Sequence, residues 1–208
     1  MKVNRSVVRS VVVACAVAIA AAPAAVAFFE GAEVGKAAPA FALKDQNGKT
    51  WKLADLAGKT VVLQWFNPDC PYVAQTYEKG LASATIEALT KDGAVFIAVN
   101  STGSAPLDDV MKKSVAFLAR HKIEHPVVFD HDGTIGRAYG AQTTPHVFVI
   151  DGKGVLRYQG ALSNDPKFTE ANPTNFVLAA SQAIKSGAAP AVTYQKPWGT
   201  NVTYKPHN

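Results

Sequence analysis

One cysteine lies at a predicted transition from strand to helix. The β-branched and aromatic run Thr60 to Phe66 predicts a buried strand, and helical character begins at Tyr72, just after Cys70. Pro71 suits the first position of a helix because its missing N–H needs no partner there, so we expect Cys70 to be the N-cap. A thiolate there would face free backbone N–H groups and the positive end of the helix dipole. The neighbouring Asp69 would oppose ionisation of the thiol, and a packed structural cysteine is the alternative.

Alternating predicted strands and helices would place this cysteine at one end of an α/β sheet. Right-handed crossovers between parallel strands, followed by a closing antiparallel pair, predict a mixed central sheet flanked by helices. Ligands of open α/β sheets bind at the carboxyl ends of strands, which is where Cys70 should lie. The expected strands are 60–66, 94–99, 126–129, 146–150 and 155–159, the helices 72–91, 107–121, 135–139 and 175–185, and an Asn-Gly turn predicts an N-terminal β-hairpin over 40–53.

The two ends of the chain differ in composition from its centre. Residues 1–27 combine early cations, a short apolar run and a small-residue cleavage site after Ala27, which predicts a cleaved signal peptide and a periplasmic or secreted protein. A permanent membrane span would need a longer apolar run. Processing as a lipoprotein at Cys15 is the alternative. We expect a flexible lead-in over 28–39, one domain over 40–187, and a Pro/Thr-rich tail over 188–208.

Charge and cysteine content narrow the classes of function. The chain has 208 residues and a formal net charge of +5, but three of its cations belong to the predicted signal peptide. The remaining, nearly neutral chain has no cluster of Lys and Arg, which argues against a nucleic-acid partner. The chain contains two cysteines. Cleavage would leave Cys70 alone, so an intramolecular disulfide would be impossible and a reactive thiol is favoured.

Three ordered segments carry a resemblance to a known superfamily. They are Cys70-Pro71-Tyr72-Val73, Gly136-Arg137-Ala138-Tyr139-Gly140-Ala141 and Thr143-Thr144-Pro145-His146. Together with the order of elements they resemble the thioredoxin-like fold in its exported redoxin or peroxiredoxin-like form, which includes alkyl hydroperoxide reductase/thiol-specific antioxidant proteins. The resemblance covers about residues 35–205.

The resemblance implies a thiol-dependent oxidoreductase with antioxidant activity and no cofactor. Cys70 would react with a peroxide or with a protein disulfide or thiol, and an external reductant or resolving thiol would regenerate it. Asn67 would polarise the site, and Pro145 would be a cis-proline that shapes the groove. The backbone of Thr144 would bind substrate, with Pro68, Asp69 and Pro71 lining the same site.

The chain departs from the resembled patterns at several positions. A thioredoxin dithiol would need cysteine where this sequence has Asn67, so two-sulfur exchange within the motif is excluded. Peroxiredoxins carry Thr and Pro at the positions of Asn67 and Leu63, and their Arg aligns near Pro145. Relatives often have a cysteine in the tail where Thr200 stands, so an oxidised Cys70 would have to be resolved by another molecule.

Non-enzymatic roles form the alternative class. A binding module or copper carrier could pair Cys70 with His146, although strand alternation turns His146 away if Thr144 faces the cysteine. His121 and His125 have helical metal spacing, but Pro126 favours a solvated loop. The segment Asp130-His131-Asp132-Gly133 predicts a turn, because the other positions of a calcium loop are missing.

Overall fold

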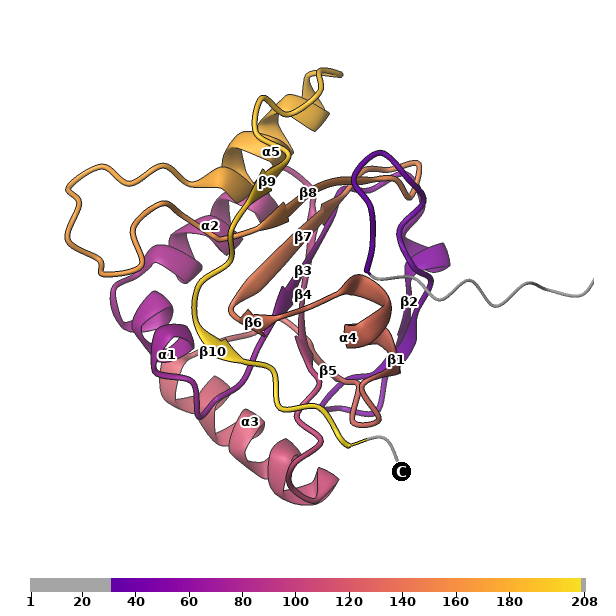
Figure 1. Cartoon of the computed structure of the whole chain (residues 1–208), viewed down its shortest axis with the longest axis vertical. Helices are drawn as coiled ribbons and strands as arrows, with labels where there is room; N and C mark the ends of the chain where they lie inside the picture. The colour runs from indigo at the N-terminus through magenta and orange to yellow at the C-terminus, as the bar shows by residue number, and fades with distance from the viewer. Residues whose placement is uncertain (1–30, 207–208) are drawn as a thin grey trace, which may run out of the picture.

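The computed structural model describes residues 31–206, and within this part a six-stranded mixed sheet forms the centre of the fold (Figure 1). Its strand order is β5-β4-β3-β7-β8-β9. The pairs β3/β4, β4/β5 and β8/β9 are parallel, whereas β7 is antiparallel to both β3 and β8. The strands are β3 (Val61–Trp65), β4 (Val95–Asn100), β5 (Val127–Phe129), β7 (His146–Ile150), β8 (Leu156–Gly160) and β9 (Tyr194–Gln195). The predicted α/β class with a mixed sheet is confirmed.

Four helices, α1, α2, α3 and α5, cover one face of the sheet, while the short helix α4 and an N-terminal hairpin cover the other (Figure 1). The residues of β3 and the residue that follows it alternate between the two layers: Val62 and Phe66 pack with the helical layer, and Leu63 and Trp65 pack on the opposite face. All five residues of β3 are buried, as its unbroken apolar pattern predicts for a central strand. The helices are α1 (Pro71–Glu78), α2 (Leu81–Lys91), α3 (Leu107–His121), α4 (Thr134–Tyr139) and α5 (Phe176–Lys185), and a short 3-10 helix, η1, spans Leu53–Leu56.

The single helix predicted over 72–91 is wrong, because the chain forms two helices there. Helix α1 ends at Glu78, and α2 begins only at Leu81. Gly80 between them has a φ of 77°, in the left-handed region that glycine enters without steric cost. The break lets each short helix pack its own apolar face, and Val73 and Leu89 are both buried in the same layer.

The N-terminal part of the domain combines a confirmed prediction with a correction. Strands β1 (Ala42–Lys44) and β2 (Thr50–Lys52) form the antiparallel hairpin that the Asn-Gly pair predicts. Residues 31–39, expected to be a flexible lead-in, are instead hydrogen-bonded to the fold. The N–H groups of Gly35 and Ala38 donate to the carbonyls of Leu156, the first residue of β8, and Gly154, which precedes that strand. The predicted signal peptide and Cys15 lie outside the described residues.

The C-terminal tail is an ordered part of the fold. Strand β9 pairs with β8, so the β7/β8 hairpin is not the sheet edge that the sequence predicts. Further along, β10 (Thr200–Asn201) pairs antiparallel with β6 (Thr143–Thr144). The sequence gives this tail no strand because each pairing spans only two residues and depends on partners far away in the chain. Among residues 31–206, no helix has the length and apolar character to cross a membrane.

Candidate active site at Cys70

The structure places Cys70 where strand β3 passes into helix α1. Cys70 is the N-cap of α1 and Pro71 is its first residue, as predicted. The side chain is only 1% exposed and packs within the helical layer. Its thiol donates a hydrogen bond of 2.8 Å to the backbone carbonyl of Thr144. The sulfur is therefore sealed from solvent but lies directly against the Thr144–Pro145 bend.

Hydrogen-bond donors around the sulfur outweigh its burial. Burial alone raises the pKa of the Cys70 thiol, because a buried thiolate loses its hydration. The hydroxyl groups of Thr144 and Thr200, with the backbone N–H groups of Val73 and Thr200, favour the thiolate and bring the pKa below its ordinary value. The N–H of Val73 belongs to the first turn of α1, although the sulfur makes no capping hydrogen bond to it. The site therefore stabilises the thiolate, which is the nucleophilic form of cysteine.

The Thr200 hydroxyl should contribute measurably to the reactivity of Cys70. We expect Thr200→Val to raise the pKa of Cys70 and to lower the fraction of thiolate at pH 7 by about two- to tenfold, because one donor to the thiolate is lost. The midpoint of the pH dependence of alkylation by iodoacetamide measures this shift separately from the maximal rate. Thr203→Val is the matched control, because the Thr203 hydroxyl contacts Ser104 instead of the sulfur. Equal alkylation profiles for Thr200→Val and wild type would contradict this role.

The bend that follows β6 has the expected shape but not the expected free backbone. The Thr144–Pro145 peptide bond is cis. We expected the backbone of Thr144 to bind substrate, but in this structure Thr144 pairs with Thr200 of the protein's own tail. The Oγ1 atoms of the two threonines also lie 3.2 Å apart. The tail takes this edge because β6 would otherwise expose unpaired backbone groups.

Asn67 and Asp69 flank the cysteine without acting on its sulfur. The amide oxygen of Asn67 accepts a hydrogen bond of 2.9 Å from the N–H of Asp69, which fixes the loop before α1. The Asp69 carboxylate forms an exposed ion pair with Lys113 at 2.6 Å. Neither residue is among the groups that shift the pKa of Cys70, so the expected opposition from Asp69 and polarisation by Asn67 are absent from this geometry. Both residues, with Pro68 and Thr203, line a cleft of about 340 Å³ beside the site.

His146 lies on the opposite face of the sheet from Cys70. Its ring packs against Phe148 at a centroid distance of 4.4 Å, and it pairs in register with Trp65. Phe148 and Trp65 belong to the core layer opposite Cys70. The Nδ1 atom of His146 accepts a hydrogen bond from the N–H of Gln142. A copper site made of Cys70 and His146 is therefore not supported, and residues 31–206 contain no cluster of three or more acidic, His or Cys side chains suited to a metal.

The buried His146 should make the fold sensitive to acid. Burial lowers its pKa to about 4, so between pH 6.5 and 4 the unfolded chain binds a proton that the folded protein does not. The free energy of unfolding should fall as pH falls through this window, by up to about 3 kcal/mol from this residue. We expect His146→Gln, which keeps an acceptor for Gln142, to flatten the decline in urea titrations at pH 7 and pH 4.5. An unchanged decline would contradict the prediction.

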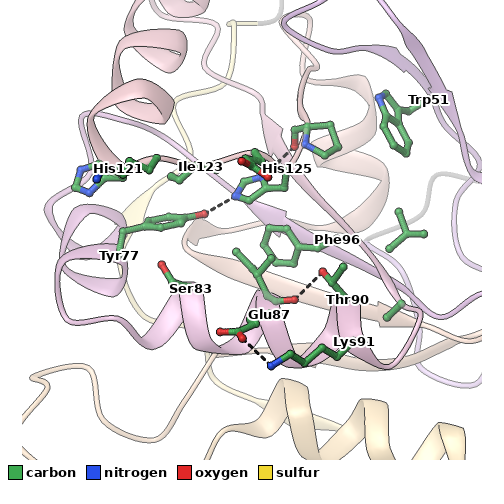
Figure 2. A pocket seen from close by; sticks show the side chains of 16 residues that line it. Trp51, Tyr77, Ser83, Glu87, Thr90, Lys91, Phe96, His121, Ile123 and His125 are labelled. Carbon is green, nitrogen blue, oxygen red and sulfur yellow. Dashed lines mark hydrogen bonds and ion pairs between the residues drawn. The ribbon is translucent and has the colours of Figure 1, made fainter.

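A second hollow lies away from the cysteine. It measures about 650 Å³ and is bordered by α2 and by the segment that follows α3 (Figure 2). Within it, the Tyr77 hydroxyl and Nε2 of His125 are 2.8 Å apart (Figure 2). His125 thus packs against Tyr77 and Phe96 instead of lying in the expected solvated loop. The 650 Å³ hollow contains none of the predicted site residues.

The segment 130–133 forms the predicted turn. The N–H of Gly133 donates to the carbonyl of Asp130, and the buried Asp130 carboxylate accepts from the N–H groups of Ile135 and Gly136. The carboxylate therefore caps the start of α4, which explains its burial without a calcium ion.

Comparison with known proteins identifies the family. The sequence profile of the AhpC/TSA family matches residues 34–159, which contain Cys70 and the Thr144–Pro145 bend. The chain belongs to the AhpC/TSA family. This family assignment and the fold together place the protein among the thioredoxin-like redoxins, as the sequence motifs predict. The family match ends before the C-terminal tail.

Curated relatives of this AhpC/TSA protein carry the names of thiol–disulfide enzymes. The thiol-disulfide oxidoreductase ResA of Bacillus thuringiensis is 30% identical over 132 residues, which cover 60% of this chain and 68% of the relative. The thiol:disulfide interchange protein DsbE of Yersinia pestis is 31% identical over 138 residues, which cover 64% of this chain and 66% of the relative.

Solved structures confirm the fold. A hypothetical protein from Sinorhizobium meliloti superimposes with a TM-score of 0.74 at 23% identity, covering 84% of this chain and 96% of its own. A DsbE-type interchange protein from Chlorobium tepidum superimposes with a TM-score of 0.52 at 29% identity, covering 62% and 85%.

Proposed function

We propose that this protein is an exported thiol–disulfide oxidoreductase that uses Cys70 as its single nucleophile. The observation that carries the proposal is the position of the sulfur, which lies at the N-cap of α1 against the Thr144–Pro145 bend and is surrounded by donors that lower its pKa. The names of the curated relatives support thiol–disulfide chemistry over peroxide chemistry. The predicted signal sequence supports export.

The reaction proceeds in three exchanges, two of which involve Cys70. The Cys70 thiolate attacks one sulfur of a substrate disulfide, forming a mixed disulfide and releasing the other sulfur as a thiolate. Cys70 is the free cysteine of residues 31–206, so no second sulfur in this part of the chain attacks the mixed disulfide. A thiolate from an external reductant attacks the substrate sulfur, regenerates the Cys70 thiolate and leaves the substrate joined to the reductant. One further thiol of the reductant completes the reduction.

Trapping the mixed disulfide tests this function. The purified mature chain is incubated with a small aromatic disulfide or with hydrogen peroxide between pH 5 and pH 9, and intact mass is recorded. A disulfide adduct on Cys70 that forms faster than on free cysteine at pH 6 supports the proposal, because a lower pKa leaves more thiolate there. Oxidation by peroxide with no disulfide adduct would favour the peroxidase alternative. Absence of both reactions would leave a binding module.

A further inference from the structure

The C-terminal segment Tyr194–Lys205, here called the strap, runs from β9 past α1 to β10 (Figure 1), and its Thr200 lies against Thr144 and Cys70. It begins at β9, which pairs with β8, and continues through β10, which pairs with β6. Beyond β10, the N–H of Val202 donates to the carbonyl of Gln142, and the N–H of Gly103 donates to the carbonyl of Thr203. The strap is thus held by segments on both sides of Cys70.

Glycines in the body and in the strap make this close fit possible. A Cβ atom at Gly160 would overlap the backbone of Gln195, and one at Gly103 would overlap the backbone of Lys205. A Cβ atom at Gly199, which has a φ of +140°, would overlap the carbonyl of Thr144. Backbone packs directly against backbone at all three places, so a side chain at any of them would push the strap away.

Thr200 of the strap lies against the sulfur of Cys70, next to Thr144. Thr200 pairs with Thr144 and contributes its hydroxyl and its N–H to the surroundings of Cys70. Further along, Thr203 forms part of the wall of the 340 Å³ cleft that Asn67 and Asp69 also line. Lifting residues 199–203 would uncover the edge of β6 and remove Thr200 from the sulfur and Thr203 from the cleft.

The strap is anchored at both ends of the segment that covers Cys70. Trp198 donates its indole N–H to the carbonyl of Ser163 at 2.8 Å and packs against the rings of Tyr72 and Phe168. At the other end, Tyr204 donates its hydroxyl to the carbonyl of Ala141 at 2.7 Å, and the Arg137 guanidinium lies over its ring. Between the two anchors, strand β10 spans only two residues. Such a short pairing opens locally more readily than the core unfolds.

We propose that residues 199–203 form a gate that closes the Cys70 site and must detach from Thr143 and Thr144 before the sulfur reacts. This inference rests on the function proposed above and adds its regulation. In the closed state the protein's own strand occupies the edge of β6 and the thiol is inaccessible. In the open state residues 199–203 lift away while Trp198 and Tyr204 stay anchored, and the Thr144 hydroxyl and the N–H of Val73 remain as donors to the sulfur.

Two variants of the full mature chain move the gate in opposite directions. Gly199→Ala should displace the strap from Thr144, and we expect Cys70 to be alkylated by iodoacetamide at least about tenfold faster than in wild type. Gly187→Ala is the matched control, because Gly187 also has a positive φ but open space around its Cβ position, and its alkylation rate should not change. The Cys70 peptide is quantified by mass spectrometry.

The second variant, Thr143→Cys/Asn201→Cys, locks the gate. These residues oppose each other across β6 and β10, so an oxidised dithiol reagent should join them in a disulfide while it is itself reduced. The locked form should be alkylated at Cys70 at least about tenfold more slowly than the same protein reduced. If Gly199→Ala fails to fold by circular dichroism, the locked variant decides alone. Equal rates in the locked and reduced forms would overturn the gate.

The outcomes separate the gate from the proposed function. If alkylation follows the gate but no variant forms a mixed disulfide with the aromatic disulfide, the gate stands and the oxidoreductase function fails. If mixed disulfides form equally fast in wild type, Gly199→Ala and the locked variant, the function stands and the gate fails.

Discussion

Replacing Cys70 with serine should abolish thiol–disulfide exchange, reducing the rate by about 10³-fold or more. The hydroxyl of serine stays protonated at neutral pH and does not form a mixed disulfide, so the covalent step is lost. The fold should be retained, because the serine hydroxyl can still donate to the Thr144 carbonyl that accepts from the thiol. Turnover of a disulfide substrate with a thiol reductant, compared at equal protein concentration, measures the loss.

The control for this loss is a variant that keeps the sulfur but changes its surroundings. Asn67→Ala removes the acceptor for the N–H of Asp69 and leaves the donors around Cys70 in place. It should retain most of the activity. If Cys70→Ser kept more than a small fraction of the wild-type rate, the reaction would have to use another group and the assignment of Cys70 would be wrong.

Placing a cysteine at position 200 should create a disulfide with Cys70. The Thr200 side chain acts directly on the sulfur, so Thr200→Cys would bring two sulfur atoms together. An oxidised dithiol reagent should remove both thiol hydrogens and be reduced in exchange. The bond would close a loop that spans most of the domain. In the chain-entropy model, such a cross-link raises the free energy of unfolding by about 4–5 kcal/mol. Titration of free thiols and urea unfolding, each with and without reductant, measure both effects.

Asn201→Cys is the matched control for this disulfide. Asn201 is the next residue of β10, and its side chain is exposed. Alternation along a strand directs it away from the face that Thr200 presents to Cys70. Asn201→Cys should therefore leave both Cys70 and the introduced cysteine as free thiols. Efficient disulfide formation in Asn201→Cys, or none in Thr200→Cys, would show that the strap does not lie against the sulfur as described.

Comparison of the sequence with the structure shows which features are local. The buried strand β3, helix α3 and the N-cap position of Cys70 were all predictable, because each depends on residue patterns within a few positions of the chain. The split between α1 and α2 was missed, although Gly80 carries a signal for it. A single glycine within an apolar helical pattern is often tolerated, so only the packing of the two short helices decides the break.

The position of Cys70 beside the Thr144–Pro145 bend was predictable, but the contacts around it were not. The sequence by itself determined the thioredoxin-like order of elements, the cysteine at position 70 and the absence of cysteine at Asn67 and Thr200, because these follow from residue type and order along the chain. Only the tertiary structure decided three contacts. The Asn67 amide oxygen accepts from the N–H of Asp69, His146 packs in the core layer opposite Cys70, and Thr200 pairs with the edge of β6. These features depend on contacts between residues far apart in the chain, and no local pattern fixes which distant partner a backbone edge will bind.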